Sequence, residues 1–306
     1  MTAARRLIIG CGYVGRRVAQ KWIERGDTVS ALTRSAEHAR QLRELGVQPV
    51  LGDVTDTATL ANLPDAETVL YAVGFDRASG HALRDVSVGG LRNVLESVVS
   101  SAPRFIYVSS TSVYAQQAGE WVVETSPCEP ATDNGCICLE AEGLVRQFFP
   151  KSDGPETSGG IILRLAGIYG PGRLIARLEA LKRGEPLPGN PDAWLNLIHV
   201  DDAVAAILAA TERGPTGETY LVCDDAPPTR RDYYARLAKL VGVPAPSMTM
   251  GSPNDASSAG LNKRCSNRRL RAELCVDLLF PTIATGLPQS VASEPTAAPG
   301  SPTTPA

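Results

Sequence analysis

Three glycines, Gly10, Gly12 and Gly15, stand between a short apolar run and an amphipathic one near the start of the chain. The apolar run predicts a buried strand, and apolar side chains then recur at helical spacing as far as Ile23. A Gly-Asp turn and a second apolar run follow, so strand, glycine turn, helix and strand fit into about thirty residues. In this context a G-x-G-x-x-G sequence binds the pyrophosphate of a dinucleotide at the helix N-terminus. A glycine-rich turn that binds no ligand is the alternative.

The same alternation of strand and helix continues as far as residue 165. Further strands are predicted at residues 28–32, 47–51, 68–73, 104–110 and 161–165, and helices at residues 36–45, 83–99 and 139–149. Strands that alternate with helices form a parallel sheet with right-handed crossovers and helices on both faces. We therefore expect residues 1–165 to form an α/β domain with a doubly wound parallel sheet, the Rossmann fold. In such sheets ligands bind beyond the carboxyl ends of the strands.

The rest of the chain has a looser pattern. Shorter helix and strand signals occur at residues 174–181, 194–200, 202–210 and 233–240. We expect residues 166–287 to form a small α+β lobe on the substrate side, with parts that return to the Rossmann sheet. Residues 288–306 are rich in Pro, Ser, Thr and Ala. Such a segment buries too little apolar surface to offset its ordering entropy, so a disordered tail is predicted there.

Composition excludes several classes of partner. The 306 residues are 43% apolar and 21% charged, with a net charge of −3 and without a basic stripe or a long apolar run. We therefore expect neither a nucleic-acid partner nor a membrane partner. The seven cysteines are odd in number and lack paired C-x-x-C spacing, and the chain shows no metal-ligand pattern. No metal site is predicted, and a reducing cytoplasm is the expected location.

Five segments occur in the order found in a known family. They are GCGYVG at residues 10–15, GDV at 52–54, SSTSVY at 109–114, LRLAGIYGPGR at 163–173 and NLIHVDDAV at 196–204. With these segments the chain resembles the extended short-chain dehydrogenases/reductases, in the branch of NAD-dependent epimerases and dehydratases, over roughly residues 5–285. The cofactor-binding residues predicted from the glycine motif and from this resemblance are Gly10, Gly12, Tyr13, Val14, Gly15, Arg34, Asp53, Val54, Ala72, Val73 and Gly74.

The end of the second predicted strand bears on the choice of nicotinamide cofactor. NAD sites usually place an acidic residue there, whereas an arginine suits the 2′-phosphate of NADP. The stretch ALTRS contains Arg34 and no acidic residue, which favours NADP over NAD. A solvated surface arginine is the alternative for Arg34. For Asp53, which the resemblance places near the adenine, the alternative is an Asx-turn or a helix cap.

The resemblance also implies catalytic positions. Ser110 lies where the family keeps the Ser or Thr that hydrogen-bonds a reacting substrate oxygen, and a hydroxyl that merely ends a strand is the alternative. When Ala141 and Glu142 are set on the family's Ala-Glu, its Tyr-x-x-x-Lys pair corresponds to Asn134 and Cys138. An amide does not titrate, and a neutral thiol is no fixed cation. The chain therefore resembles an atypical subgroup that lacks the catalytic pair.

Other candidate groups have structural explanations. Tyr114 and Tyr169 follow predicted strands, and His199 with Asp201 resembles a base with its orienting carboxylate. In the family that the chain resembles, the tyrosine that corresponds to Tyr114 usually has no proton-transfer role. The His-Val-Asp-Asp stretch of that family mostly fixes a strand–helix junction. If the protein is catalytically active, we therefore expect the activity to depend on Ser110 more than on these residues.

Two functions are consistent with the sequence. The first is an NAD(P)-binding, epimerase/dehydratase-like oxidoreductase with a non-standard active site and a small-molecule or sugar-nucleotide-like substrate. The alternative is a redox-inactive NAD(P)-binding sensor or regulatory protein. Many relatives dimerise through the helices predicted here at residues 83–99 and 139–149, so the resemblance also suggests a homodimer.

Overall fold

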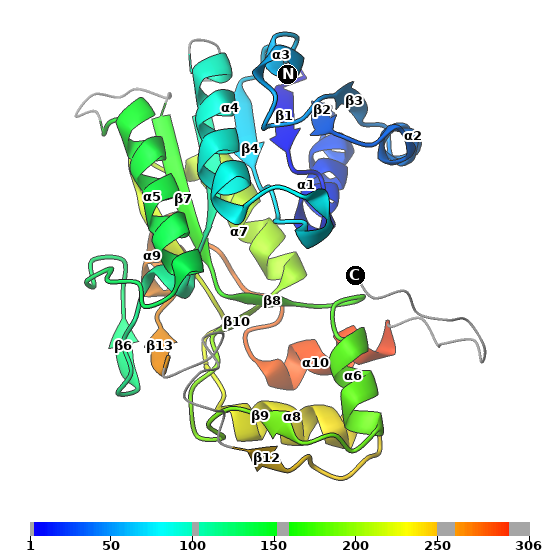
Figure 1. Cartoon of the computed structure of the whole chain (residues 1–306), viewed down its shortest axis with the longest axis vertical. Helices are drawn as coiled ribbons and strands as arrows, with labels where there is room; N and C mark the ends of the chain where they lie inside the picture. The colour runs from blue at the N-terminus through cyan, green and yellow to red at the C-terminus, as the bar shows by residue number, and fades with distance from the viewer. Residues whose placement is uncertain (1–2, 100–103, 152–158, 250–260, 294–306) are drawn as a thin grey trace.

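The computed structural model describes residues 3–99, 104–151, 159–249 and 261–293. A seven-stranded parallel sheet forms its centre, in the order β11-β7-β5-β4-β1-β2-β3 (Figure 1). Its strands are β1 (Arg5–Ile9), β2 (Thr28–Thr33), β3 (Gln48–Leu51), β4 (Thr68–Tyr71), β5 (Arg104–Ser110), β7 (Gly159–Leu165) and β11 (Thr219–Val222). Strand order reverses between β1 and β4, as in a doubly wound sheet. The predicted Rossmann fold is confirmed.

Alternate side chains along the strands feed two hydrophobic cores. Ile8 of β1 packs with α1 (Tyr13–Glu24), α2 (Ala36–Glu44), α7 (Val200–Arg213) and α9 (Arg268–Leu274). Its neighbours Leu7 and Ile9 pack instead with α3 (Thr57–Leu60), α4 (Gly90–Val98) and α5 (Asp133–Phe148). This period of two sends successive residues to opposite faces, which explains why the central strands read as continuous apolar runs.

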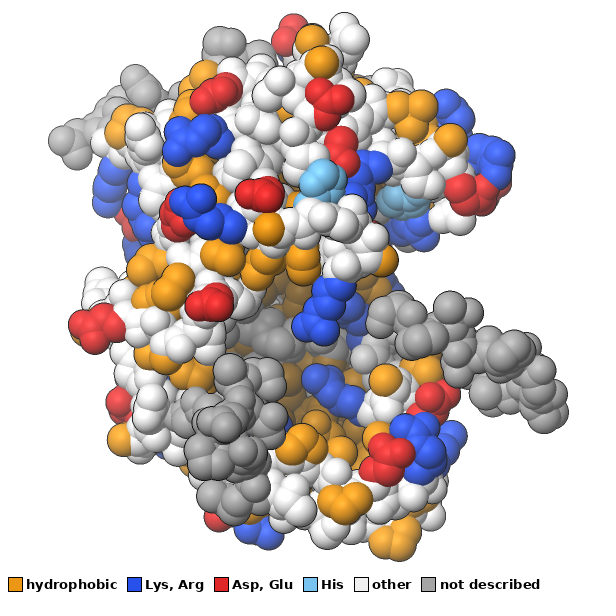
Figure 2. Space-filling model, viewed as in Figure 1, with side chains coloured by type: hydrophobic (Ala, Val, Ile, Leu, Met, Phe, Trp, Pro, Cys, Tyr) orange, Lys and Arg blue, Asp and Glu red, His pale blue; other side chains and the backbone are white. Residues whose placement is uncertain are grey.

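A smaller lobe lies beyond the carboxyl ends of the strands. It holds a third hydrophobic cluster, built from α6 (Ile175–Lys182), α8 (Arg230–Leu240) and α10 (Ile283–Ala292). Three short strand pairs lie outside the central sheet: β8 (Gly167–Tyr169) with β10 (Leu197–His199), β9 (Leu187–Pro188) with β12 (Met248–Thr249), and β6 (Glu120–Val122) with β13 (Lys263–Cys265). Figure 2 shows a hollow between the two parts, with hydrophobic and Lys or Arg side chains gathered in it.

The second half of the chain contributes to both parts. Strand β11 pairs in parallel with β7 at the edge of the main sheet, and α7 packs on the same face as α1. A short 3-10 helix η1 (Arg77–Ser79) follows β4. The helix predicted at residues 83–99 forms from residue 83 to Val98, with a π-helical turn η2 (Asp85–Gly89) near its start. The strand predicted at residues 194–200 is shorter, since only β10 forms and its end becomes the first turn of α7.

Two predicted boundaries are wrong. Helix α5 begins at Asp133 rather than at residue 139, because the Thr132 side chain accepts a hydrogen bond from the Gly135 N–H and caps it. The disordered tail predicted from residue 288 is wrong for residues 288–292, because α10 continues to Ala292 with Pro288 inside it. Buried Leu287 and Ser290 anchor that helix, and such packing outweighs the unfavourable propensity of proline. The rest of the predicted tail, residues 294–306, lies outside the described residues.

Several chemical features are absent from the described part of the chain. None of its helices is long and apolar enough to cross a membrane. Its His, Cys, Asp and Glu side chains form no group of three or more that could hold a metal ion. Each of the seven cysteines is a free thiol in this structure.

A buried ion pair joins α5 to the sheet. The Arg164 guanidinium of β7 donates from Nε and Nη2 to the two carboxylate oxygens of Glu142, at 2.9 and 2.7 Å. The Ser109 hydroxyl of β5 donates to the same carboxylate at 2.7 Å. The Glu142 side chain is 0% exposed and that of Arg164 is 4% exposed. Burial alone would raise the pKa of Glu142, but the hydrogen bonds and charge of Arg164 lower it below the ordinary value.

Replacement of Glu142 by Gln should destabilise the fold strongly. The change leaves the Arg164 charge buried without its counter-ion, and breaking such a pair costs about 3–5 kcal/mol in unfolding free energy. Glu140→Gln is the matched control: Glu140 lies on the same helix, 41% exposed and paired with Arg84, where about 0–1 kcal/mol is expected. Urea unfolding measures both variants. Equal stabilities for the two variants would contradict the assignment.

The Glu142 carboxylate should also give the protein an acid-labile component of stability. Its folded-state pKa lies below the ordinary value of 4.5, so the contribution is complete above that pH and is lost as the pH falls through the lower folded-state value. Urea unfolding over that pH range should show this loss in the unmodified protein and a flatter profile in Glu142→Gln.

Candidate functional site

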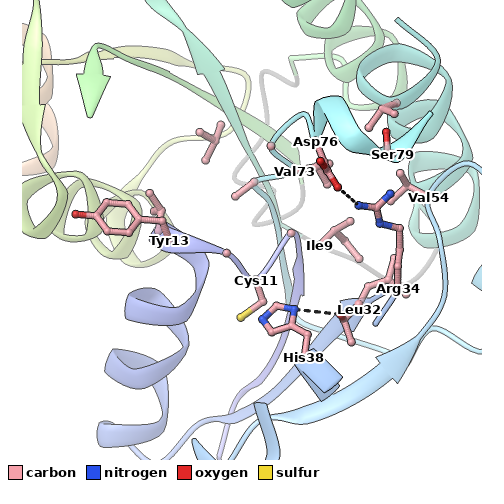
Figure 3. Close-up of a pocket in the computed structure, with 18 of the residues that line it drawn as sticks. Ile9, Cys11, Tyr13, Leu32, Arg34, His38, Val54, Val73, Asp76 and Ser79 are labelled. Carbon is pink, nitrogen blue, oxygen red and sulfur yellow. Dashed lines mark hydrogen bonds and ion pairs between the residues drawn. The ribbon is translucent and has the colours of Figure 1, made fainter. Parts of the chain in front are cut away.

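A cavity of about 480 Å³ lies at the carboxyl ends of β1, β2 and β4 (Figure 3). This volume falls within the range of roughly 300–1,000 Å³ that is typical of small-molecule sites. The predicted cofactor residues that line it are Gly10, Gly12, Tyr13, Val14, Arg34, Asp53, Val54, Ala72, Val73 and Gly74. The remaining predicted residue, Gly15, lies behind the lining. The cavity occupies the point where the strand order reverses, at which doubly wound folds bind ligands.

The three glycines of the motif differ in their surroundings. A Cβ on Gly10, whose φ is +93°, would lie 2.6 Å from the backbone of Ala72, so glycine lets β1 end directly against β4. A Cβ on Gly15 would lie 2.7 Å from the Gly10 carbonyl oxygen, so glycine lets α1 pack against the turn. A Cβ on Gly12 would meet no heavy atom of the described residues within 4 Å. Gly12 is therefore the open point of this cradle.

Positive electrostatic potential converges on the open point. Helix α1 begins at Tyr13, and within the described residues its N-terminus has no side-chain cap and its first turn no acidic residue. The positive end of the helix dipole thus faces the cavity without compensation. Arg173, which follows β8, also lines the cavity, and its guanidinium lies 4.9 Å from the centre of the Tyr13 ring. The Tyr13 hydroxyl donates to the Pro171 carbonyl at 2.8 Å and fixes this junction. The glycine cradle, the helix terminus and the arginine fit the pyrophosphate of a dinucleotide.

Arg34, at the end of β2, interacts with two carboxylates. Its Nη2 donates to Asp76 at 3.2 Å, and its Nε lies 3.9 Å from Asp53 (Figure 3). Asp53 also accepts hydrogen bonds from the backbone N–H and the hydroxyl of Thr55, both at 2.8 Å. Burial alone would raise the pKa of Asp53, but Thr55 and Arg34 lower it below its ordinary value. Asp53 therefore forms the Asx-turn considered as an alternative and lines the cavity as well.

Several residues that line the cavity were not predicted from the sequence. His38 of α2, Asp76 and Ser79 near η1, and Arg173 of the smaller lobe all line the cavity. His38 lies in the first turn of α2 and its Nδ1 is 3.1 Å from the Thr33 hydroxyl, which brings the ring back to the end of β2. Their positions in the sequence could have indicated them, because they follow β2, β4 and β8, and the carboxyl ends of these strands face the cavity.

The predicted catalytic residues lie outside this lining. Ser110 ends β5, and its hydroxyl accepts the Ser112 N–H at 3.1 Å, which caps the 3-10 turn η3 (Thr111–Val113). Asn134 and Cys138 are one turn apart on α5. The Asn134 amide donates to the Ser112 hydroxyl at 3.4 Å, and the Cys138 thiol lies close to the same side chain. Burial raises the pKa of Cys138, so the thiol is neutral near pH 7.

The remaining candidates form structural contacts. His199 is fully buried, its Nδ1 accepts the Asp201 N–H at 3.2 Å as the cap of α7, and its Nε2 is 3.0 Å from Gln289. Burial lowers the pKa of His199, which favours the neutral ring. Tyr114 is fully buried and its hydroxyl donates to the Val123 carbonyl at 3.0 Å. Tyr169 is also fully buried, with its ring edge-on to His199.

Known proteins resemble this chain over nearly its whole length. Protein YeeZ of Escherichia coli K12 is 29% identical over 282 residues, which cover 90% of this chain and 95% of YeeZ. A conserved protein of unknown function from Silicibacter pomeroyi is 27% identical, with a TM-score of 0.77 over 96% of this chain and 100% of that one. UDP-glucose 4-epimerase of Thermotoga maritima, solved with UDP-glucose, shares the fold at 19% identity, with a TM-score of 0.78 over 94% of this chain and 98% of the epimerase.

The family model agrees with the fold and with the position of the cavity. The model described as "NAD dependent epimerase/dehydratase family" matches residues 7–223, which include every strand of the central sheet except the first two residues of β1. The matched segment also contains all of the residues that line the cavity. The chain belongs to the NAD-dependent epimerase/dehydratase family.

Proposed function

We propose that this protein is an NAD(P)-dependent oxidoreductase or epimerase that acts on a small molecule or a sugar-nucleotide-like compound. The observation that carries the proposal is the glycine cradle, which is closed at Gly10 and Gly15 and open into the cavity at Gly12. Family membership and the epimerase with the same fold support it. The seven free thiols are consistent with the cytoplasmic location that we propose.

In this proposal each side of the cavity holds one part of the cofactor. The nicotinamide supplies the hydride acceptor or donor when bound. The Gly12 backbone and the start of α1 hold the pyrophosphate, Asp53 with Val54 lies at the adenine, and residues 72–74 line the path toward the nicotinamide. Arg34 favours NADP by contact with the 2′-phosphate. The smaller lobe lies on the substrate side.

The proposed active site is non-standard. Ser110 would hold a reacting substrate oxygen through its hydroxyl, at the end of β5. Asn134 and Cys138 both contact Ser112 and are both neutral, so neither supplies the proton or the fixed positive charge of the usual pair. General acid–base catalysis contributes about 10²–10⁴-fold in rate, and we expect that contribution to be absent unless another group supplies it.

The presence of Asn134 and Cys138 in place of the usual catalytic pair favours a second candidate function. A protein that keeps the cradle but replaces the catalytic pair with an amide and a buried thiol is suited to sense NAD(P) rather than to turn it over. In either case, α4 and α5 lie side by side on one face of the sheet (Figure 1), and we propose this surface for a homodimer.

Gly12→Val should weaken cofactor binding without damage to the fold. The added side chain would occupy the open point of the cradle, and we expect NADPH and NADH affinities to fall by more than about tenfold, or about 1.4 kcal/mol. Gly143→Val is the matched control, because Gly143 is an exposed glycine of α5 that also has no described atom within 4 Å of a built Cβ. Calorimetric titration measures affinity, and circular dichroism measures folding. Undiminished affinity in folded Gly12→Val contradicts the site.

Arg34→Ala tests the preference for NADP. Loss of a charge-assisted contact to the 2′-phosphate should weaken NADPH binding by about tenfold and leave NADH binding nearly unchanged. Arg43→Ala, which removes the same charge from the exposed end of α2, should change neither affinity. The preference is refuted by equal losses for the two cofactors, or by no loss.

Turnover separates the two candidate functions. The near-ultraviolet absorbance of reduced nicotinamide should change slowly or not at all with a panel of sugar nucleotides and small carbonyl compounds. Ser110→Ala should remove whatever turnover is observed, and Asn134→Tyr combined with Cys138→Lys should increase it. Rapid turnover by the unmodified protein that survives Ser110→Ala would overturn the proposed site. Complete inactivity of all variants that still bind cofactor would favour the sensor.

A further inference from the structure

A buried carboxyl group lies where the smaller lobe meets the central sheet. Asp224 follows β11 and is 1% exposed. Its backbone N–H donates to the Leu197 carbonyl of β10 at 2.7 Å, and its Oδ2 lies 3.4 Å from the Tyr169 hydroxyl of β8. Its Oδ1 has no hydrogen-bond partner among the described residues. Asp224 therefore connects the edge of the sheet to β8 and β10, with one of its two oxygens unsatisfied.

The surroundings of Asp224 supply no counter-ion. The titratable groups that face it are Asp202 of α7, Tyr169 of β8, His199 of β10, and Cys223 and Asp225 of its own segment. Helix α10 packs against Tyr169 and contains no titratable residue. The nearby arginines pair with other carboxylates, Arg271 of α9 with Asp225 and Asp277, and Arg17 of α1 with Asp201. A charge on Asp224 would thus be buried without a cation among the described residues.

Two carboxyl groups share this cluster, and their hydrogen bonds differ. Asp202 is as deeply buried as Asp224, but its carboxylate accepts the backbone N–H groups of Leu279 and Phe280, at 2.7 and 2.9 Å. Asp224 has only the long contact with Tyr169 and a nearby backbone N–H of His199. The negative charge is therefore better placed on Asp202, and the proton on Asp224. Burial and the charge of Asp202 raise the pKa of Asp224 to about 8, in agreement with a neutral acid.

Tyr169 links this carboxyl group to the cofactor cavity. Its neighbour Ile168 in β8 lines the cavity, and so does Arg173, which follows β8. A Cβ on Gly286 of α10 would overlap the Tyr169 hydroxyl, so that hydroxyl is enclosed between α10 and Asp224. An ionised Asp224 needs water at its unsatisfied oxygen. Water can enter this enclosed space only if Tyr169, and β8 with it, moves.

We propose that Asp224 is a pH-sensitive switch of the cofactor cavity: the neutral acid holds β8 against the end of β11, and ionisation admits water and displaces β8 together with Arg173. Cofactor binding is then weaker when Asp224 is charged. The control of cofactor binding rests on the proposed NAD(P) function, whereas the effect of Asp224 on the fold does not.

The first test measures stability as a function of pH. An unfolded aspartate has the ordinary pKa of 3.8, so between that pH and about 8 the folded protein binds one proton more than the unfolded chain. Stability must therefore fall as the pH rises through this range. From about pH 6 to about pH 8, urea unfolding should show that the folding equilibrium constant falls by about ten- to a hundredfold relative to Asp224→Asn, which cannot ionise.

Asp225→Asn is the matched control for this measurement. Asp225 is the next residue of the chain, but it is exposed and pairs with Arg271 at 2.6 Å. This variant should keep the pH dependence of the unmodified protein. The switch is refuted if the unmodified protein and Asp224→Asn have the same pH dependence, or if Asp225→Asn abolishes it equally.

The second test measures NADH binding by calorimetric titration at about pH 6.5 and about pH 9. NADH is used because the 2′-phosphate of NADPH would itself titrate near the lower value. The affinity of the unmodified protein and of Asp225→Asn should fall by up to about tenfold at the higher pH, the loss of one charge-assisted contact as Arg173 withdraws. Asp224→Asn should bind NADH equally at both.

The two tests separate the parts of the inference. If stability depends on Asp224 as expected but NADH affinity does not change with pH, the control of the cavity is wrong. If neither NADH nor NADPH binds at either pH, the proposed function fails, and urea unfolding still decides the role of Asp224. If Asp224→Asn does not fold, NMR of labelled aspartate carboxyl carbons in the unmodified protein replaces it. The absence of a carboxyl group that titrates near pH 8 then refutes the switch.

Discussion

The buried pair between Glu142 and Arg164 fixes the position of α5 against β5 and β7. Burial of two charges is costly unless both are fully hydrogen-bonded, and here the carboxylate receives two bonds from Arg164, one from Ser109 and one from Arg146. The helix is thus held by a buried ion pair, and the hydrogen bond from Asn134 to Ser112 adds a second contact.

The shape of the cavity at the glycine turn depends on close approach of backbone segments rather than on side chains. At Gly10 and Gly15, an added methyl group would lie 2.6–2.7 Å from neighbouring backbone atoms, so these positions set the shape of the turn. At Gly12 the same methyl group would meet only open space. One motif thus combines two residues that stabilise the fold with one that leaves room for a ligand.

The balance of positive and negative charge differs from one part of the cavity to another. The start of α1 and Arg173 make the centre positive, whereas Asp53 and Asp76 offset Arg34 on one side. The centre of the cavity is therefore the part that is electrostatically suited to an anion. Asn134, Cys138 and Ser112 are neutral, so these three residues add no fixed charge near the end of β5.

The sequence by itself determined the strand–turn–helix units, the parallel sheet and the location of the cradle, because periodicity and glycine placement act over a few residues at a time. Of the predicted cofactor residues, all except Gly15 line the cavity, because they follow strands whose ends meet at one edge of the sheet. Only the tertiary structure decided which distant groups meet there. Arg173 reaches Tyr13 from the smaller lobe, Asp76 shares Arg34 with Asp53, and β11 returns to the sheet beside β7. The same holds for α10, where buried packing of Leu287 overrides a sequence rich in helix-disfavouring residues. These contacts join segments many residues apart, and they depend on strand order and on the balance of charges in space, neither of which any local pattern encodes.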